Sequence, residues 1–172
     1  MFSLAASYYI TMLSIPDGSP LHAMRVTEAN LTLLETAIET YRQAHNAYPD
    51  AGERGLNSAV AELSREADYL PGGAPADAWG RPYVYVPFEA YGEPGAEAMK
   101  DESGAYAAPG SYQLYSRGLD GISSALPSDA NTDNIVSWDR SKPWQARYRH
   151  KHKEFVARWR KMTPDERMKK PQ

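Results

Sequence analysis

The sequence predicts an α+β domain in which a long N-terminal helix packs against a small three-stranded antiparallel sheet. An apolar stripe with helical spacing runs through residues 24–45, and three short β-prone segments follow after residue 80. Hydrophobic residues make up 42% of the 172-residue chain, which is enough for one core. Because each strand has an apolar face to bury and the helix offers an apolar stripe, we expect the two to pack together.

Two helices are predicted before the strands. The long helix covers residues 19–49 and is ended by Pro49 and the turn residues that follow it. Its apolar stripe recurs at steps of three and four and consists of Met24, Thr27, Leu31, Leu34, Ile38, Tyr41 and His45. A shorter helix is predicted over residues 54–70, with Leu56, Val60 and Leu63 on one face.

Three strands are predicted at residues 83–86, 111–116 and 134–138, each next to glycine, proline or other turn residues. Between the first two, residues 88–110 are rich in Gly, Ala, Glu and Pro and show no sustained period. We expect a mobile loop there.

The charges divide the chain into an acidic body and a basic tail. From Lys142 onward there are 11 Lys and Arg against 3 Asp and Glu, whereas residues 1–141 hold 8 basic and 19 acidic groups. We therefore distinguish an N-terminal apolar segment (1–23), a globular domain (24–140) and a basic, helical tail (141–172). Opposite charges in two parts of one chain indicate different partners.

The tail combines its positive charge with an aromatic stripe. Trp144, Tyr148, Phe155 and Trp159 fall on one helical face, and Arg and Lys occupy the others. Such a segment suits the acidic body of a neighbouring copy, which we favour, or else an anionic membrane surface or the phosphates of nucleic acid. It is also typical of a solvated charged helix that docks by its aromatic side.

Residues 2–15 are uncharged and mostly apolar, but 14 residues fall short of the roughly 20 that a helix needs to cross a bilayer. No Lys or Arg precedes them, and Pro16-Asp17-Gly18 ends the segment. Two interpretations remain, a helix packed on the core and a membrane anchor, whole or truncated.

Residues 115–139 gather more side-chain oxygens than a surface turn needs, among them Asp120, Asp133 and Asn134. Calcium prefers six to eight oxygen ligands, and a loop held between two strands can supply them. The alternative is a plain turn at Asp120 with Asp133 capping the last strand, and the standard EF-hand spacing is absent. Because the chain has no cysteine and no nucleophile, phosphate-loop or zinc-protease motif, we do not expect an enzyme.

Five segments, in order, resemble the major pseudopilin of type II secretion systems, the general secretion pathway protein G family, over about residues 24–139. They are Tyr48-Pro49 at the helix end, Gly55-Leu56, Pro75 to Tyr83, Ser116 to Gly121, and Asp133 to Trp138. The resemblance implies a pilin-like fold and a structural subunit of the pseudopilus that takes part in protein export. It also implies an inner-membrane anchor, a periplasmic globular domain, and partners that are further copies of the chain, other pseudopilins or secretion-machine proteins.

The resemblance further implies a calcium site and an assembly face. The calcium ligands would be the side chains of Asp120, Asp133 and Asn134 and the backbone carbonyls of Arg117 and Ile122. Asn134 stands where a second aspartate is usual, so one negative charge is missing, and Asp129 or Asn131 could compensate. Assembly would use helix packing along a fibre axis, through Leu31, Leu34, Ile38 and Tyr41 and the apolar segment before them.

Three features depart from the family pattern. Only Phe2-Ser3-Leu4 matches its opening, with no leader and with an alanine where the assembly glutamate would fall. Residues 88–110 resemble an insertion, and the tail after Asp139 is foreign to the family. These departures keep an alternative open: a pseudopilin-like binding module that does not polymerise, whose tail contacts nucleic acid, anionic lipid or a partner protein.

Overall fold

The computed structural model describes residues 20–67 and 73–139, together with a few residues of the tail. Its helices are α2 (Pro20–His45) and α3 (Gly52–Ala67), and its strands are β1 (Val84–Pro87), β2 (Tyr112–Ser116) and β3 (Ile135–Val136). Two short 3-10 helices, η1 (Phe88–Ala90) and η2 (Asp129–Asn131), lie in the connections. The predicted α+β class is confirmed, and each element lies within a few residues of its predicted position.

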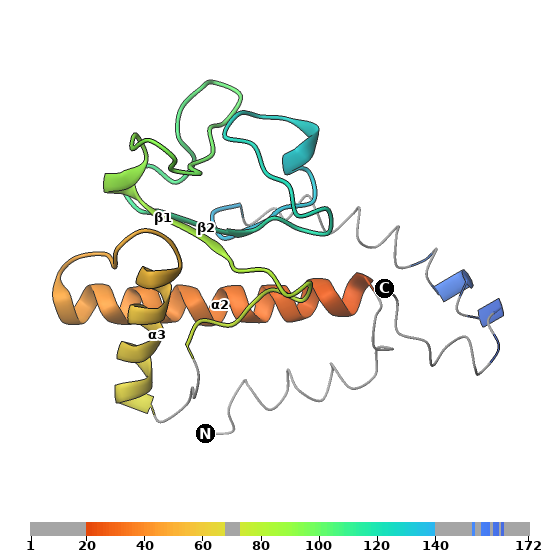
Figure 1. The fold of residues 1–172 in the computed structure, drawn as a ribbon, viewed down its shortest axis with the longest axis horizontal. Helices are drawn as coiled ribbons and strands as arrows, with labels where there is room; N and C mark the ends of the chain where they lie inside the picture. Colours follow the sequence, from red (N-terminus) through yellow and green to blue (C-terminus); the bar gives the residue numbers. More distant parts are fainter. Residues whose placement is uncertain are drawn as a thin grey trace.

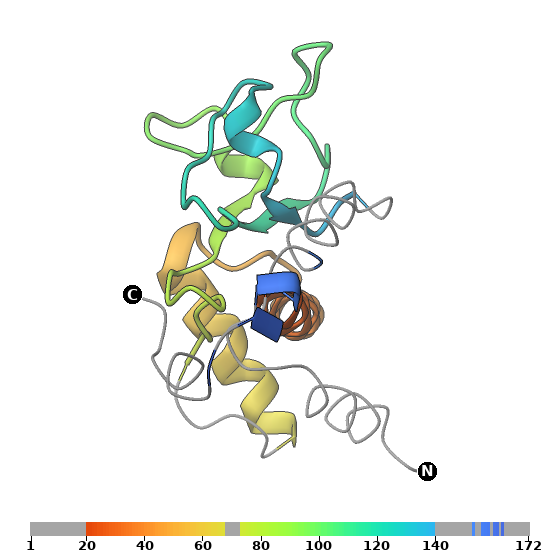
Figure 2. The same ribbon diagram turned by 90° about the vertical axis from the view of Figure 1, so that its right-hand side faces the viewer.

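The three strands form one antiparallel sheet in the order β1-β2-β3, with Tyr85 opposite Leu114 and Tyr115 opposite Val136. Figure 1 shows α2 along one face of this sheet, with α3 crossing α2 near its C-terminal end. Figure 2, turned by 90°, shows the connecting loops 88–110 and 117–134 on the other side of the sheet from α2. The sheet is therefore the middle of three layers.

The main core lies between the helices and the sheet. Leu34, Ile38 and Leu114 are fully buried in it, and Leu31 is 5% exposed. Two tyrosines of the sheet edge are anchored to helix-side carbonyls, because the Tyr83 hydroxyl donates to Thr27 O (2.8 Å) and the Tyr85 hydroxyl donates to Pro49 O (3.2 Å). Burial raises the pKa of both phenols above their ordinary value, so both hydroxyls stay protonated as donors.

The stripe expected to serve as an assembly face is instead part of this core. Leu31, Leu34 and Ile38 are buried against the sheet and α3 within one chain, and Tyr41 packs at the edge of the same cluster. The packing of this stripe against the sheet was predicted correctly, because the sheet needs an apolar surface and this stripe faces it. Its role in assembly, which the resemblance implied, stays a prediction.

A second core covers the opposite face of the sheet. Alternation along the strands turns Val84, Val86 and Tyr115 away from α2, and residues of the 88–110 segment bury them. Tyr91, Ala98 and Met99 are the buried residues that this segment contributes. The expectation of a mobile loop was therefore wrong: the segment lacks periodicity because it packs through a few scattered side chains.

Special backbone conformations fix the turn between the helices. Helix α2 ends before the predicted Pro49, because Asn46 adopts the left-handed conformation (φ 52°) that commonly closes a helix. Gly55 lies inside α3, where any Cβ would overlap the carbonyl group of Asp50. A glycine is required there for the turn to approach the helix so closely.

Several predictions fall on residues outside the described part of the chain. These include most of the N-terminal segment 1–23 and the tail residues Trp144, Tyr148, Phe155 and Trp159. Of the tail residues that are described, Lys153, residues 156–158, Arg160 and Lys161 are helical and Thr163 is not, and the described basic side chains are exposed. Among the described helices, none combines the length and apolar character required to span a membrane.

Leu34→Ala should lower the free energy of unfolding by about 2–5 kcal/mol, because it removes a fully buried side chain and leaves a cavity. Urea denaturation measures the change. The control Leu126→Ala removes a leucine that is 61% exposed and should cost less than about 0.5 kcal/mol. If Leu34→Ala left stability unchanged but weakened self-association, the stripe would be an assembly face after all.

Candidate functional site

The candidate site is the loop that connects β2 to β3, residues 117–134. It begins with a tight turn in which Gly118 has φ +64°, and a Cβ there would overlap the backbone of Asp133. The two ends of the loop are therefore in direct backbone contact, and only glycine permits it. Leu119, Ile122 and Leu126 project from the loop as exposed apolar side chains.

Asp133 holds the first turn of the loop in place. Its Oδ2 accepts hydrogen bonds from the backbone N–H of Leu119 (2.7 Å) and of Asp120 (3.1 Å). The residue is 3% exposed, and its other oxygen, Oδ1, has no hydrogen-bond partner within the described part of the chain. A buried carboxylate oxygen without a donor is costly, so a cation beside it would relieve a real deficit.

Asn131 staples the middle of the loop and is fixed in orientation. Its Oδ1 accepts from Ser124 N (2.8 Å), and its Nδ2 donates to the carbonyls of Ser124 (2.9 Å) and Leu126 (3.1 Å). With three bonds defining its amide, the oxygen that faces Asn134 at 3.3 Å must be an acceptor. A hydrogen bond between the two side chains therefore requires the NH2 group of Asn134 on this side, whereas the rotated amide would direct its NH2 group to two backbone carbonyls.

This orientation turns Asn134 Oδ1 toward two backbone carbonyls. It lies 3.2 Å from Arg117 O and 3.3 Å from Ile122 O, and all three atoms are acceptors. Rotating the amide would let its nitrogen donate to both carbonyls, but it would also press its oxygen against Asn131 Oδ1. Three converging oxygens with no hydrogen between them are a typical arrangement for a bound cation.

The predicted ligands are only partly gathered. Asn134 meets the carbonyls of Arg117 and Ile122, and Asp133 binds the same turn from the neighbouring position. The Asp120 side chain is exposed, and its Oδ1 accepts from Ile122 N (2.8 Å), which makes it a turn former in this state. Asn131 staples the loop and Asp129 begins η2. The ligand assignment itself stays a prediction.

The donor set is the kind that a hard cation selects. Within the described residues no three His, Asp or Glu side chains come together in a group that could hold a metal. The loop instead offers carboxylate, amide and carbonyl oxygens, which suit calcium and do not suit zinc. The residues present therefore fit a calcium ion in chemistry.

The turn at residues 77–81 is bonded to the start of the loop, a connection that sequence reasoning did not predict. The buried Asp77 carboxylate accepts from the backbone N–H of Trp79 (3.0 Å) and Arg81 (2.9 Å) and from Ser116 Oγ (2.6 Å). Ser116 Oγ in turn accepts from Gly118 N (3.2 Å), the residue at the start of the loop. The Asp77 turn and the loop are thus joined through one hydroxyl.

Arg81 makes a second connection between the same two segments. Its Nη2 donates to Gly118 O and to Leu119 O (3.2 Å), and its guanidinium lies 5.6 Å from the ring centroid of Trp79. A Cβ on Gly121 would overlap this guanidinium, so the loop carries glycine where Arg81 enters. The sequence signal was the Asp-Ala-Trp-Gly-Arg run, but its partner lies 37 residues away.

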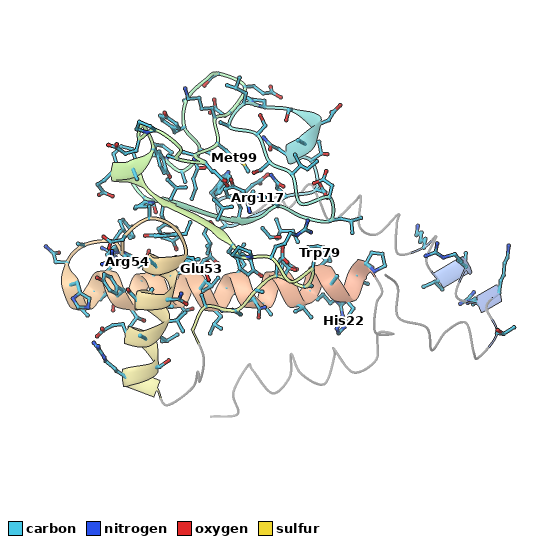
Figure 3. All side chains as sticks on the ribbon, viewed as in Figure 1. His22, Glu53, Arg54, Trp79, Met99 and Arg117 are labelled. Carbon is cyan, nitrogen blue, oxygen red and sulfur yellow. The ribbon has the colours of Figure 1, made fainter. Side chains whose placement is uncertain are left out.

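Figure 3 shows Trp79 between α2 and the sheet, and Arg117 on the opposite side of the sheet.

The family model of type II secretion system protein G matches residues 22–138, which is more than half of the chain. The chain belongs to that family. No curated protein and no solved structure matches it. The family is one of pseudopilins, structural and envelope-associated proteins that assemble with other pseudopilins of the secretion machinery. A role as a type II secretion pseudopilin in protein transport follows for this chain.

Ser116→Ala should lower the free energy of unfolding by about 1–3 kcal/mol, because it leaves the buried Asp77 oxygen without its donor and Gly118 N without its acceptor. Chemical denaturation measures the loss. Ser58→Ala is the matched control, since Ser58 is exposed and bonds only within its own helix. In a double-mutant cycle with Asp77→Ala, a coupling below about 0.5 kcal/mol would contradict the connection.

Proposed function

We propose that the chain is a calcium-stabilised structural subunit that polymerises into the pseudopilus of a type II secretion machine. The family match supports the secretion role. The observation that carries the calcium part is the meeting of Asn134 Oδ1 with the carbonyls of Arg117 and Ile122, next to a buried Asp133 oxygen that lacks a donor.

A calcium ion would supply positive charge to these converging oxygens. The chain's own residues do the rest: Asp133 and Gly118 bring the loop ends together, and Asn131 fixes the amide of Asn134. In the absence of a cation the oxygens repel one another and the 117–134 loop gains conformational freedom. Calcium binding would therefore appear as folding free energy of the domain.

Asn134→Asp should respond to calcium with opposite signs in two conditions. In chelator the new carboxylate faces two carbonyl oxygens, so the melting temperature should fall below that of the unmodified chain. In excess calcium the added charge should strengthen the site by about tenfold, so the melting temperature should rise above it. Differential scanning calorimetry in both conditions measures the two shifts.

The control for this variant is Glu89→Gln, which changes one charge at an exposed position in η1, outside the loop. It should shift the melting temperature little in either condition. If calcium and chelator give the unmodified chain the same melting temperature, the calcium part of the proposal is wrong and the loop is held by its hydrogen bonds alone.

Assembly needs a surface other than the buried stripe of α2. We assign the main contact between copies to the apolar segment of residues 2–15, which would also hold the subunit in the inner membrane with its globular domain in the periplasm. A second contact follows from charge. The tail carries 11 basic groups, its described basic side chains are exposed, and the body of a neighbouring copy is acidic.

Overexpression of the full chain in a secretion-competent host should give filaments that electron microscopy detects. Replacing the exposed Arg158, Arg160 and Lys161 together by Glu should reduce filament number, because the tail would then repel the acidic body. The matched control replaces the same three residues by Lys or Arg and keeps the charge. Absence of filaments, with salt-sensitive retention of the chain on anionic vesicles or DNA, would instead identify a non-polymerising binding module.

A further inference from the structure

The segment of residues 88–110, here called the clasp, contacts the candidate calcium loop directly at two points and is linked to it at a third through Tyr115 of β2. The backbone N–H of Lys100 donates to Ala125 O (2.8 Å). The Glu97 carboxylate forms an ion pair with the guanidinium of Arg117. The Tyr115 hydroxyl donates to Glu97 O (3.0 Å) and lies 3.4 Å from Ser123 Oγ. Both ends of the first half of the loop, Arg117 and Ala125, are thus tied to one segment.

These contacts flank the two carbonyls that face Asn134. Arg117 supplies one of the carbonyls, and its side chain is paired with Glu97. Ile122 supplies the other and lies next to Ser123, which the Tyr115 hydroxyl contacts. The clasp and the loop also enclose a hollow of about 490 Å³, lined by Ala96, Tyr115, Ile122 and neighbouring residues. The clasp therefore lies beside the part of the loop that supplies both carbonyls.

The clasp is itself held in place by hydrogen bonds to strand β2. The buried side chain of Gln113 on β2 accepts from Met99 N (2.6 Å) and donates to Met99 O (2.9 Å) and Ala107 O (2.8 Å). A bridge between Lys100 and Tyr106 closes the segment on itself. Figure 3 shows Met99 and Arg117 on the same side of the sheet, away from α2.

The Tyr115 phenol is suited to a permanent link. Its ring packs edge-on against Trp138, with ring centroids 6.0 Å apart, and is almost fully buried. The hydroxyl is therefore positioned by a buried, closely packed ring.

We propose that the clasp sets the calcium affinity of the loop by holding the Arg117 and Ile122 carbonyls in position before the ion arrives, with Tyr115 and Glu97 as positioning residues. This inference rests on the proposed calcium site. A flexible loop must lose conformational entropy when it gathers around an ion, and a loop already tied at three points loses less. The smaller entropy cost offsets the affinity that is lost because Asn134 carries no negative charge.

Tyr115→Phe tests the inference, because it removes the hydroxyl and keeps the buried ring. Isothermal titration of the full chain with calcium chloride should show binding about 3- to 10-fold weaker than in the unmodified chain. The matched control is Tyr91→Phe, which removes the buried clasp hydroxyl that donates to Ala108 O (3.0 Å), a contact inside the clasp. That control should lower thermal stability to a similar degree and leave the calcium dissociation constant unchanged.

A second pair of variants avoids the core. Glu97→Gln removes the ion pair with Arg117 but keeps the carbonyl that Tyr115 contacts, and it should weaken calcium binding at least about twofold. Glu93→Gln changes an exposed glutamate of the same clasp and should have no effect. Hydrogen exchange without calcium should be faster at Lys100 N–H in Tyr115→Phe than in Tyr91→Phe.

The outcomes separate this inference from the proposed function. If the unmodified chain binds no calcium, the proposed site is wrong and the inference falls with it. If the unmodified chain binds calcium, but Tyr115→Phe and Tyr91→Phe bind it equally well, the site exists and the clasp does not position it. Weaker binding in Tyr115→Phe and Glu97→Gln alone supports the inference.

Discussion

Burial of strand β2 on both faces is the constraint on which the rest of the molecule depends. Leu114 faces the helices, Tyr115 faces the clasp, and no residue of the strand is exposed. The buried polar side chains of the strand therefore need hydrogen-bond partners, and they find them in the segments around the candidate site. Gln113 anchors the clasp, and Ser116 joins the Asp77 turn to the start of the 117–134 loop. Two polar side chains of this central strand therefore hold three segments by hydrogen bonds: the clasp, the Asp77 turn and the start of the loop.

The elements could be predicted from the sequence because local periodicity and turn chemistry determine them. The period of α2 and the alternation of the strands follow from which residues are apolar, and both were confirmed. The period alone does not say what covers an apolar face. Packing of Leu34 and Ile38 against the sheet followed from the strands, whereas their contacts between copies were implied only by the resemblance. The packing of the clasp was not predicted, because its buried residues Tyr91, Ala98 and Met99 follow no period. Aperiodic packing leaves no pattern in one sequence.

The candidate site divides in the same way. Turn residues such as Gly118 and Asp120 indicate a loop, and the family resemblance indicates its oxygens, so the segment could be located without coordinates. The orientation of Asn134 depends on Asn131, which in turn depends on Ser124 and Leu126, and no spacing rule encodes such a sequence of contacts. Arg81 reaches the loop from 37 residues away. Long-range polar contacts of this kind are visible only after the fold has placed the strands.

The contacts of the loop and the clasp together explain why an asparagine, and not an aspartate, is tolerated at position 134. An aspartate there would set a second carboxylate beside Asp133 and against two carbonyls, and such a loop would be ordered only while a cation is bound. Asn134 removes that repulsion, and its amide can also donate to Asn131. The cost is a weaker attraction for the ion. The hydrogen bond from the clasp to Ala125 and the contact of the Tyr115 hydroxyl with Ser123 hold the loop through protein groups, so an ion at the proposed site would have less of the loop left to order.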